Sequence, residues 1–81
     1  MRVVVKLFAA AREIAGRSEV IVEVAEGTSL ANVRGALLLA VPKLESLIRH
    51  ARWAVDSEFV NDNTTVTAES EVALIPPVSG G

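Results

Sequence analysis

The feature that most limits what this chain can fold into is its short length combined with a complete lack of cysteine. Its 81 residues allow one domain built on one core. Without cysteine there can be no disulfide framework, no thiolate metal site and no nucleophilic thiol. Hydrophobic residues make up 51% of the chain, which is enough apolar material for a compact core without such supports.

The apolar residues near the N-terminus alternate with the period of a strand. Val3, Val5 and Leu7 share one face of a first strand, which leaves Phe8 on the opposite, more exposed face. A short helical stretch over 9–16 ends in a glycine, and alternating valines over 20–24 predict a second strand.

One main helix follows. Thr28 or Ser29 is placed to cap its first turn. Apolar residues then recur at helical spacing, and Pro42 predicts an end near Ala40. Gly35 lies inside this helix, where we expect it to permit close packing on a sheet.

Shorter elements complete the chain. They are a helical turn over 44–49, one or two strands over 53–60, a turn at 61–63 and a last strand over 72–75. The order of these elements, with strands first, then one main helix and then short strands, is an α+β pattern.

Charge is distributed unevenly. All eight Lys and Arg residues lie before Trp53 with five acids, a net charge of +3, while the remainder has five acids and no base. This distribution argues against a nucleic-acid surface. The acidic segment over 53–81 either faces a basic partner or is ordinarily solvated. The longest apolar run, over 36–41, is too short to span a bilayer. We expect a soluble cytoplasmic protein without a signal peptide.

The internal side chains form no recognisable catalytic set. His50 is the only histidine, so a zinc site would need carboxylates almost throughout; we expect His50 to end a helix or to face solvent. Glu69 and Glu71 are expected to be solvated. We therefore expect no metal and no cofactor bound by the chain itself.

The sequence finishes at Ile75-Pro76-Pro77-Val78-Ser79-Gly80-Gly81. The proline pair cannot donate to a sheet ladder and should end the last strand. Glycines have no Cβ and can pass through a channel too narrow for side chains, although a frayed end is the simpler alternative. We expect a domain over 1–76, a flexible Gly-Gly tail over 77–81, and reactivity concentrated at the Gly81 carboxylate.

Three stretches carry a resemblance to a known family. Residues 7–16, 54–60 and above all 71–81 are similar to the small, sulfur-carrying subunit of molybdopterin synthase, a ubiquitin-like β-grasp protein. The family often has asparagine at the position of Asp56 and Gly-Asp-Glu at 69–71, so the likeness is weaker in these turns. The resemblance implies a mixed sheet packed on one main helix, with short helical turns.

The resemblance also implies a function. An activating enzyme (an adenylyltransferase) would join Gly81 to AMP using ATP, and a persulfide would convert the adenylate to a thiocarboxylate. The carrier would then give its sulfur to cyclic pyranopterin monophosphate (precursor Z), forming the molybdopterin dithiolene of the molybdenum cofactor. Catalytic residues would belong to the large catalytic subunit, in a heterotetramer, so the chain would be a carrier rather than an enzyme by itself.

In this scheme each tail residue has a role. Gly80 keeps the backbone slim, Val78 and Ser79 contact the channel, and Pro76 and Pro77 reduce the entropy lost on binding.

Four further residues are candidates for the partner interface. Phe8, Phe59 and Ile75 would supply apolar area there, the alternative being burial in the chain's own core. Arg12 would pair across the interface, or simply lie exposed on its helix.

Two other functions stay open. A related carrier could serve thiamin synthesis or tRNA thiolation, or modify proteins at lysines, although the Pro-Pro-Val-Ser lead-in favours molybdopterin. A non-catalytic interaction domain with an inert tail is the third possibility.

Overall fold

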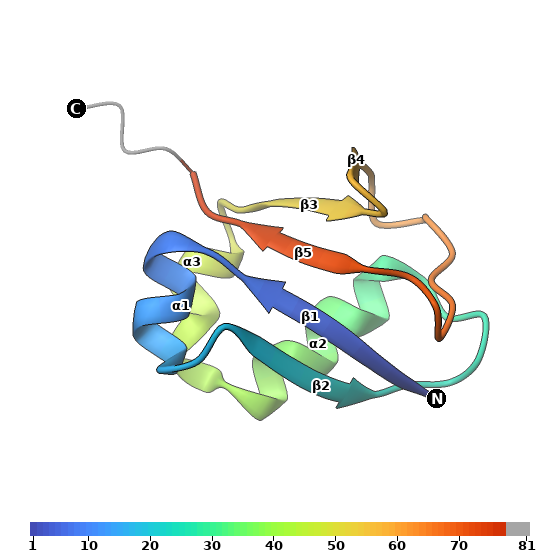
Figure 1. Ribbon diagram of the computed structural model, residues 1–81, viewed down its shortest axis with the longest axis horizontal. Helices are drawn as coiled ribbons and strands as arrows, with labels where there is room; N and C mark the ends of the chain where they lie inside the picture. The colour runs from blue at the N-terminus through green and yellow to red at the C-terminus, as the bar shows by residue number, and fades with distance from the viewer. Residues whose placement is uncertain (78–81) are drawn as a thin grey trace.

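The structure is a computed structural model and describes residues 1–77 (Figure 1). Within this range the elements are β1 Arg2–Leu7, α1 Ala9–Ala15, β2 Glu19–Glu23, α2 Leu30–Ala40, η1 Pro42–Leu44 (a 3₁₀ turn), α3 Glu45–Ile48, β3 Arg52–Val55, β4 Glu58–Phe59 and β5 Val72–Ile75. The predicted strands, the main helix and its end at Ala40 are confirmed.

The strands form one mixed sheet in the order β2-β1-β5-β3-β4. β1 is antiparallel to β2 but parallel to β5, with Val5 opposite Val72 and Leu7 opposite Leu74. The first and last strands are therefore neighbours at the centre of the sheet (Figure 1). A mixed sheet packed on one main helix confirms the α+β class and the β-grasp arrangement.

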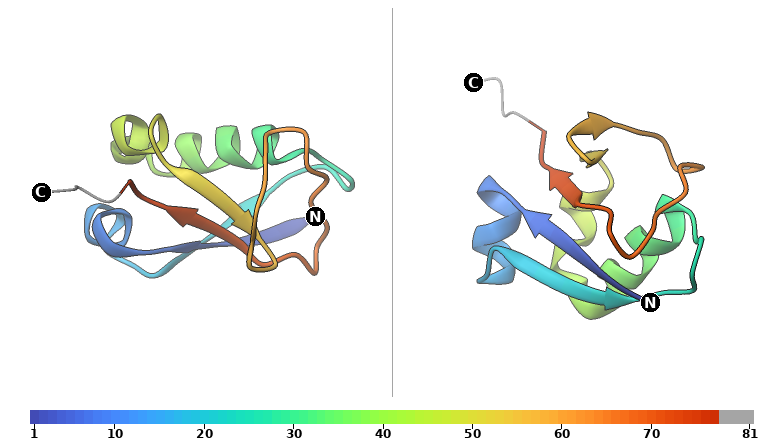
Figure 2. Two further views of the ribbon diagram at one scale, coloured as in Figure 1. Left: turned by 90° about the horizontal axis from the view of Figure 1, so that it is seen from above. Right: turned by 45° about the vertical axis from the view of Figure 1, so that its right-hand side comes forward.

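Helices cover one face of the sheet, and the core lies between the two layers (Figure 2). Val3, Val5 and Leu7 are at most 2% exposed, as the alternation predicts. Leu30, Val33 and Leu37 of α2 are equally buried opposite them, because a 3.6-residue period places them on one stripe. The opposite face of the sheet is left open.

The first turn of α2 is capped differently from the expectation. Ser29 occupies the N-cap position, but neither it nor another side chain makes a capping hydrogen bond. Instead the backbone N–H of Leu30 donates to the carbonyl of Thr64 at 2.9 Å, and that of Ala31 to the carbonyl of Asp62 at 3.1 Å. The loop after β4 thus supplies the acceptors that the serine was predicted to provide.

An ion pair strengthens the same junction. The Arg34 guanidinium donates to both carboxylate oxygens of Asp62, with 2.9 Å between Nη2 and Oδ2. The hydrogen bond from Arg34 is the main cause that lowers the pKa of Asp62, and the same bond raises the pKa of Arg34. The pair joins α2 to the loop at 61–63.

The expectation for Gly35 is wrong. A Cβ at this position would meet no heavy atom within 4 Å, and the residue is exposed. Gly35 lies two residues from both Val33 and Leu37, and a helix turns such positions away from the core face. No close helix–sheet contact requires the glycine.

Two smaller expectations concern the rest of the helical layer. His50 is exposed in the turn after α3, as predicted, and its backbone N–H donates to the carbonyl of Leu47 at 3.2 Å. Among residues 1–77, none of the helices combines the length and the apolar character that crossing a bilayer demands.

Replacing Gly35 with alanine should stabilise the fold by about 1 kcal/mol, because alanine has the higher helix propensity and its methyl group meets open space. Urea unfolding measures this free energy. Gly16→Ala is the matched control and should destabilise, since Gly16 ends α1 at φ 75°. Equal or lower stability of Gly35→Ala would contradict the assignment.

Asp62→Asn should lower the thermal midpoint at neutral pH. Because the folded-state pKa of Asp62 lies below its unfolded value, the pair stabilises the fold above the ordinary pKa of Asp, about 4. That stabilisation is lost as the pH falls through the lowered pKa, so wild type and variant should converge in acid. Glu45→Gln, which removes an exposed partner 3.6 Å from Arg49, should change little at any pH.

Candidate functional site

The root of the tail lies where β5 ends. The strand stops at Ile75, as the proline pair predicts, and Pro76 is half-buried whereas Pro77 is exposed. In Figure 1 the end of β5 lies at the same end of the sheet as α1. The predicted tail residues Val78, Ser79, Gly80 and Gly81 lie outside the described residues, and the division into 1–76 and 77–81 stays a prediction.

A groove of about 220 Å³ opens beside this root on the uncovered face of the sheet. We call it the apolar groove; its apolar walls are Phe8, Ala54, Phe59, Ala73 and Ile75, with Ser57 and Glu71 at its rim. Phe8 is 47% exposed and Phe59 57% exposed, and Ile75 is half-buried. These three predicted interface residues are therefore outside the core cluster and lie together.

Strand register explains why they gather. Ala54 pairs with Phe59 on one side and with Ala73 on the other. Ala54 is only 6% exposed although it faces away from the helices. The two small alanines form a low floor between larger neighbours. Neither was predicted, although each alternates with buried core residues of its strand and could have been placed on the open face.

A tight hairpin sets the position of Phe59. Asp56 and Ser57 connect β3 to β4 with φ of 51° and 70°, the geometry of a type I′ turn. Asp56 Oδ1 accepts from the backbone N–H of Glu71 at 2.9 Å, which ties the turn to the start of β5. Asp tolerates positive φ, so the departure from the family pattern at this position suits the geometry found here.

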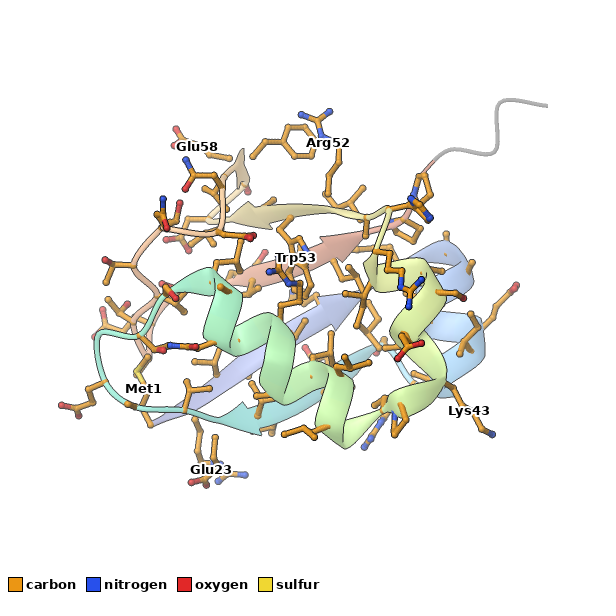
Figure 3. The ribbon with its side chains drawn as sticks, turned by 180° about the vertical axis from the view of Figure 1, so that it is seen from behind. Met1, Glu23, Lys43, Arg52, Trp53 and Glu58 are labelled. Carbon is orange, nitrogen blue, oxygen red and sulfur yellow. The ribbon has the colours of Figure 1, made fainter. Side chains whose placement is uncertain are left out.

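Arg52 holds the Phe59 ring from the side of β3. Its guanidinium carbon lies 3.8 Å from the ring centroid, a cation–π contact. Figure 3 shows Arg52 projecting beyond β3 while Trp53 lies toward α2. Arg52 was not predicted as a site residue, because its contact depends on a hairpin partner seven residues later.

Arg12 is exposed on α1, outside the apolar groove. It lines a separate pocket of about 190 Å³ that Phe8 also borders. Within residues 1–77 it has no ion-pair partner in the chain. Arg12 and the groove thus lie on either side of Phe8.

The acids of the C-terminal segment over 53–81 are partly neutralised by bases earlier in the chain. Glu71 lies 3.6 Å from Lys6, and Asp62 pairs with Arg34. The described residues include no cluster of three metal-ligating side chains. The surface beside the tail root is thus an exposed, mainly apolar groove with Ser57 and Glu71 among its lining residues.

Comparisons with known proteins agree with this geometry. Residues 5–81 match the model of the ThiS family. The molybdopterin synthase sulfur carrier subunit of Chlamydomonas reinhardtii is 34% identical over 83 residues, covering 100% of both chains. That of Arabidopsis thaliana is 34% identical over 77 residues, covering 95% of this chain and 80% of the relative.

Among solved structures, small archaeal modifier protein 1 of Haloferax volcanii superposes with a TM-score of 0.91 at 32% identity, covering 100% of both chains. The likeness therefore extends over the sheet, the helices and the tail root together. By the match over residues 5–81 and by relatives that align from end to end, this chain belongs to the ThiS family.

Proposed function

We propose that this chain is the sulfur carrier subunit of a molybdopterin synthase. The observation that carries the proposal is the 34% identity, over the full length of both chains, to a relative of that name. The structure supports it with a rigid strand that ends in a proline pair beside an exposed apolar groove. The body is a scaffold, and the reactive group is the Gly81 carboxylate.

The chemistry begins with a carboxylate that is a poor electrophile because its charge repels nucleophiles. An activating enzyme forms the Gly81 acyl adenylate from ATP and releases pyrophosphate. A persulfide sulfur displaces AMP to give an acyl disulfide, and a thiol cleaves its S–S bond to leave the thiocarboxylate. ATP is thus used by the partner, and the carrier binds no cofactor.

The thiocarboxylate then delivers its sulfur to the cyclic pyranopterin precursor in the large catalytic subunit. A dithiolene contains two sulfurs and each carrier brings one, so two loaded chains are consumed per cofactor. Five residues, 77–81, span at most about 17 Å when extended. The partner's catalytic centre must therefore lie within that distance of the point where the domain ends.

The apolar groove is the docking surface in this proposal. Phe8, Phe59 and Ile75 come from separate elements and surround a floor of two alanines, which suits a single apolar anchor from the partner. The Phe59 ring is already held by its contact with Arg52, so docking costs this side chain little freedom. Pro76 and Pro77 then restrict the directions in which the tail leaves.

A second candidate is protein modification. It is favoured by the TM-score of 0.91 and 32% identity to small archaeal modifier protein 1. A modifier would use the same Gly81 adenylate, but a lysine amine would displace AMP and form an isopeptide bond. The product distinguishes the two functions.

Intact-mass spectrometry tests the carrier chemistry. After incubation with the activating enzyme, ATP and a persulfide donor, the chain should gain the mass of one sulfur for one oxygen. Gly81→Ala should fold normally but lose nearly all transfer, because its methyl group obstructs a channel built for glycine. Full dithiolene formation by that variant would contradict the threading role of Gly81, and isopeptide adducts in place of thiocarboxylate would favour the modifier.

Phe59→Ala tests the docking surface. Loss of this ring should weaken binding to the large subunit by about tenfold or more, as for a central interface aromatic, in isothermal titration calorimetry. Leu39→Ala is the matched control: Leu39 is 84% exposed on α2 and lines neither groove wall nor tail root, so its loss should change affinity less than about twofold. Equal effects of the two substitutions would place the interface elsewhere.

A further inference from the structure

A second pocket, of about 270 Å³, adjoins the apolar groove, and Phe59 lines both. We call it the arginine pocket because Arg34 of α2, Arg49 after α3 and Arg52 of β3 line it, together with Trp53, Phe59 and Asp62. We infer that it receives a carboxylate side chain of the protein that docks on the apolar groove. The inference rests on the proposed function in so far as it needs that docked partner.

The first observation is an unmatched donor. Trp53 is 95% buried, since its exposed fraction is 5%, and it lines this pocket. Its Nε1–H has no hydrogen-bond partner among residues 1–77. The Nε1 atom itself is sealed from the pocket, so the indole N–H reports on binding at the wall that Trp53 lines rather than donating to the ligand.

The second observation is unmatched positive charge. Asp62 already receives both hydrogen bonds of Arg34. Arg49 is 3.6 Å from Glu45, an exposed pair of little strength. Arg52 has no acidic partner within the described residues and is held over the Phe59 ring. Two guanidinium groups with free N–H donors therefore remain at the pocket.

Donors in excess of acceptors select an oxyanion, and the shape of the donors selects a carboxylate. A guanidinium presents two parallel N–H groups that match the two oxygens of a carboxylate. Arg52 is pre-positioned by its ring contact, so little freedom is lost when it binds. The volume of about 270 Å³ is ample for one acidic side chain.

Continuity with the apolar groove identifies the source of the carboxylate. A partner that covers Phe59 on the groove side lies directly against the arginine pocket on the other side of the same residue. An acidic residue at the edge of the partner's contact surface would then fix the position in which the partner docks, while the apolar anchor supplies most of the affinity.

The single tryptophan allows a direct test on the full chain. In a ¹H–¹⁵N spectrum its one indole N–H signal should move saturably as sodium acetate replaces sodium chloride at constant ionic strength. Arg49→Gln should reduce the response several-fold, whereas Arg17→Gln, an exposed arginine outside the pocket, should leave it unchanged. The inference would be overturned if the indole signal did not move, or if adding sodium chloride alone moved it as far as adding sodium acetate. A response to inorganic phosphate at lower concentrations than to acetate would overturn the carboxylate assignment.

The second test measures binding to the large subunit. Arg49→Gln should weaken it about five- to tenfold and Arg49→Glu more, with both losses shrinking at high salt. Arg49 does not line the apolar groove, so a loss of affinity in these variants would not come from a change in that groove. If Arg49→Gln and Arg49→Glu both bind the large subunit with unchanged affinity, the inference is overturned. Docking on the apolar groove is tested separately by Phe59→Ala. If wild type fails to bind the large subunit at all, the proposed function fails, and the acetate titration separately decides whether the pocket accepts a carboxylate.

Discussion

The parallel pairing of β1 with β5 is the contact on which the candidate site depends. It joins Val5 to Val72 and Leu7 to Leu74, residues from opposite ends of the chain. Closing so long a loop is costly in chain entropy, and the buried valines and leucines on the helix side offset that cost. Because the two strands run in the same direction, Phe8 and the tail root both follow strand ends that lie at the same end of the sheet.

The two sides of the sheet's open face differ in polarity. Across β1 and β2 the outward residues include two opposite-charge pairs, Arg2 with Glu23 and Lys6 with Glu19, with the apolar pair Val4 and Ile21 between them. Across β5, β3 and β4 the outward residues are alanines and large apolar side chains, joined by Arg52, which is opposite Ile75 and lies over the Phe59 ring. The proposed docking uses the strands nearest the tail, where the outward side chains are mainly apolar.

Local patterns predicted the elements, and long-range contacts decided the details. Alternation placed the strands and Pro42 ended α2, because both effects act within a few residues. The cap of α2 could not be predicted, since its acceptors come from the loop at 62–64. The meeting of Phe8, Phe59 and Ile75 also depends on strand order, which periodicity leaves open.

The proposed function requires the carrier to be released as readily as it is bound, because one tail would visit an activating enzyme and a synthase in turn. A groove of about 220 Å³ is large enough for one apolar anchor of the partner. Apolar contact alone discriminates poorly between partners that share the same anchor. A charged pocket adjoining that groove at Phe59 adds discrimination with little added apolar area, so that affinity and partner choice are set by different residues.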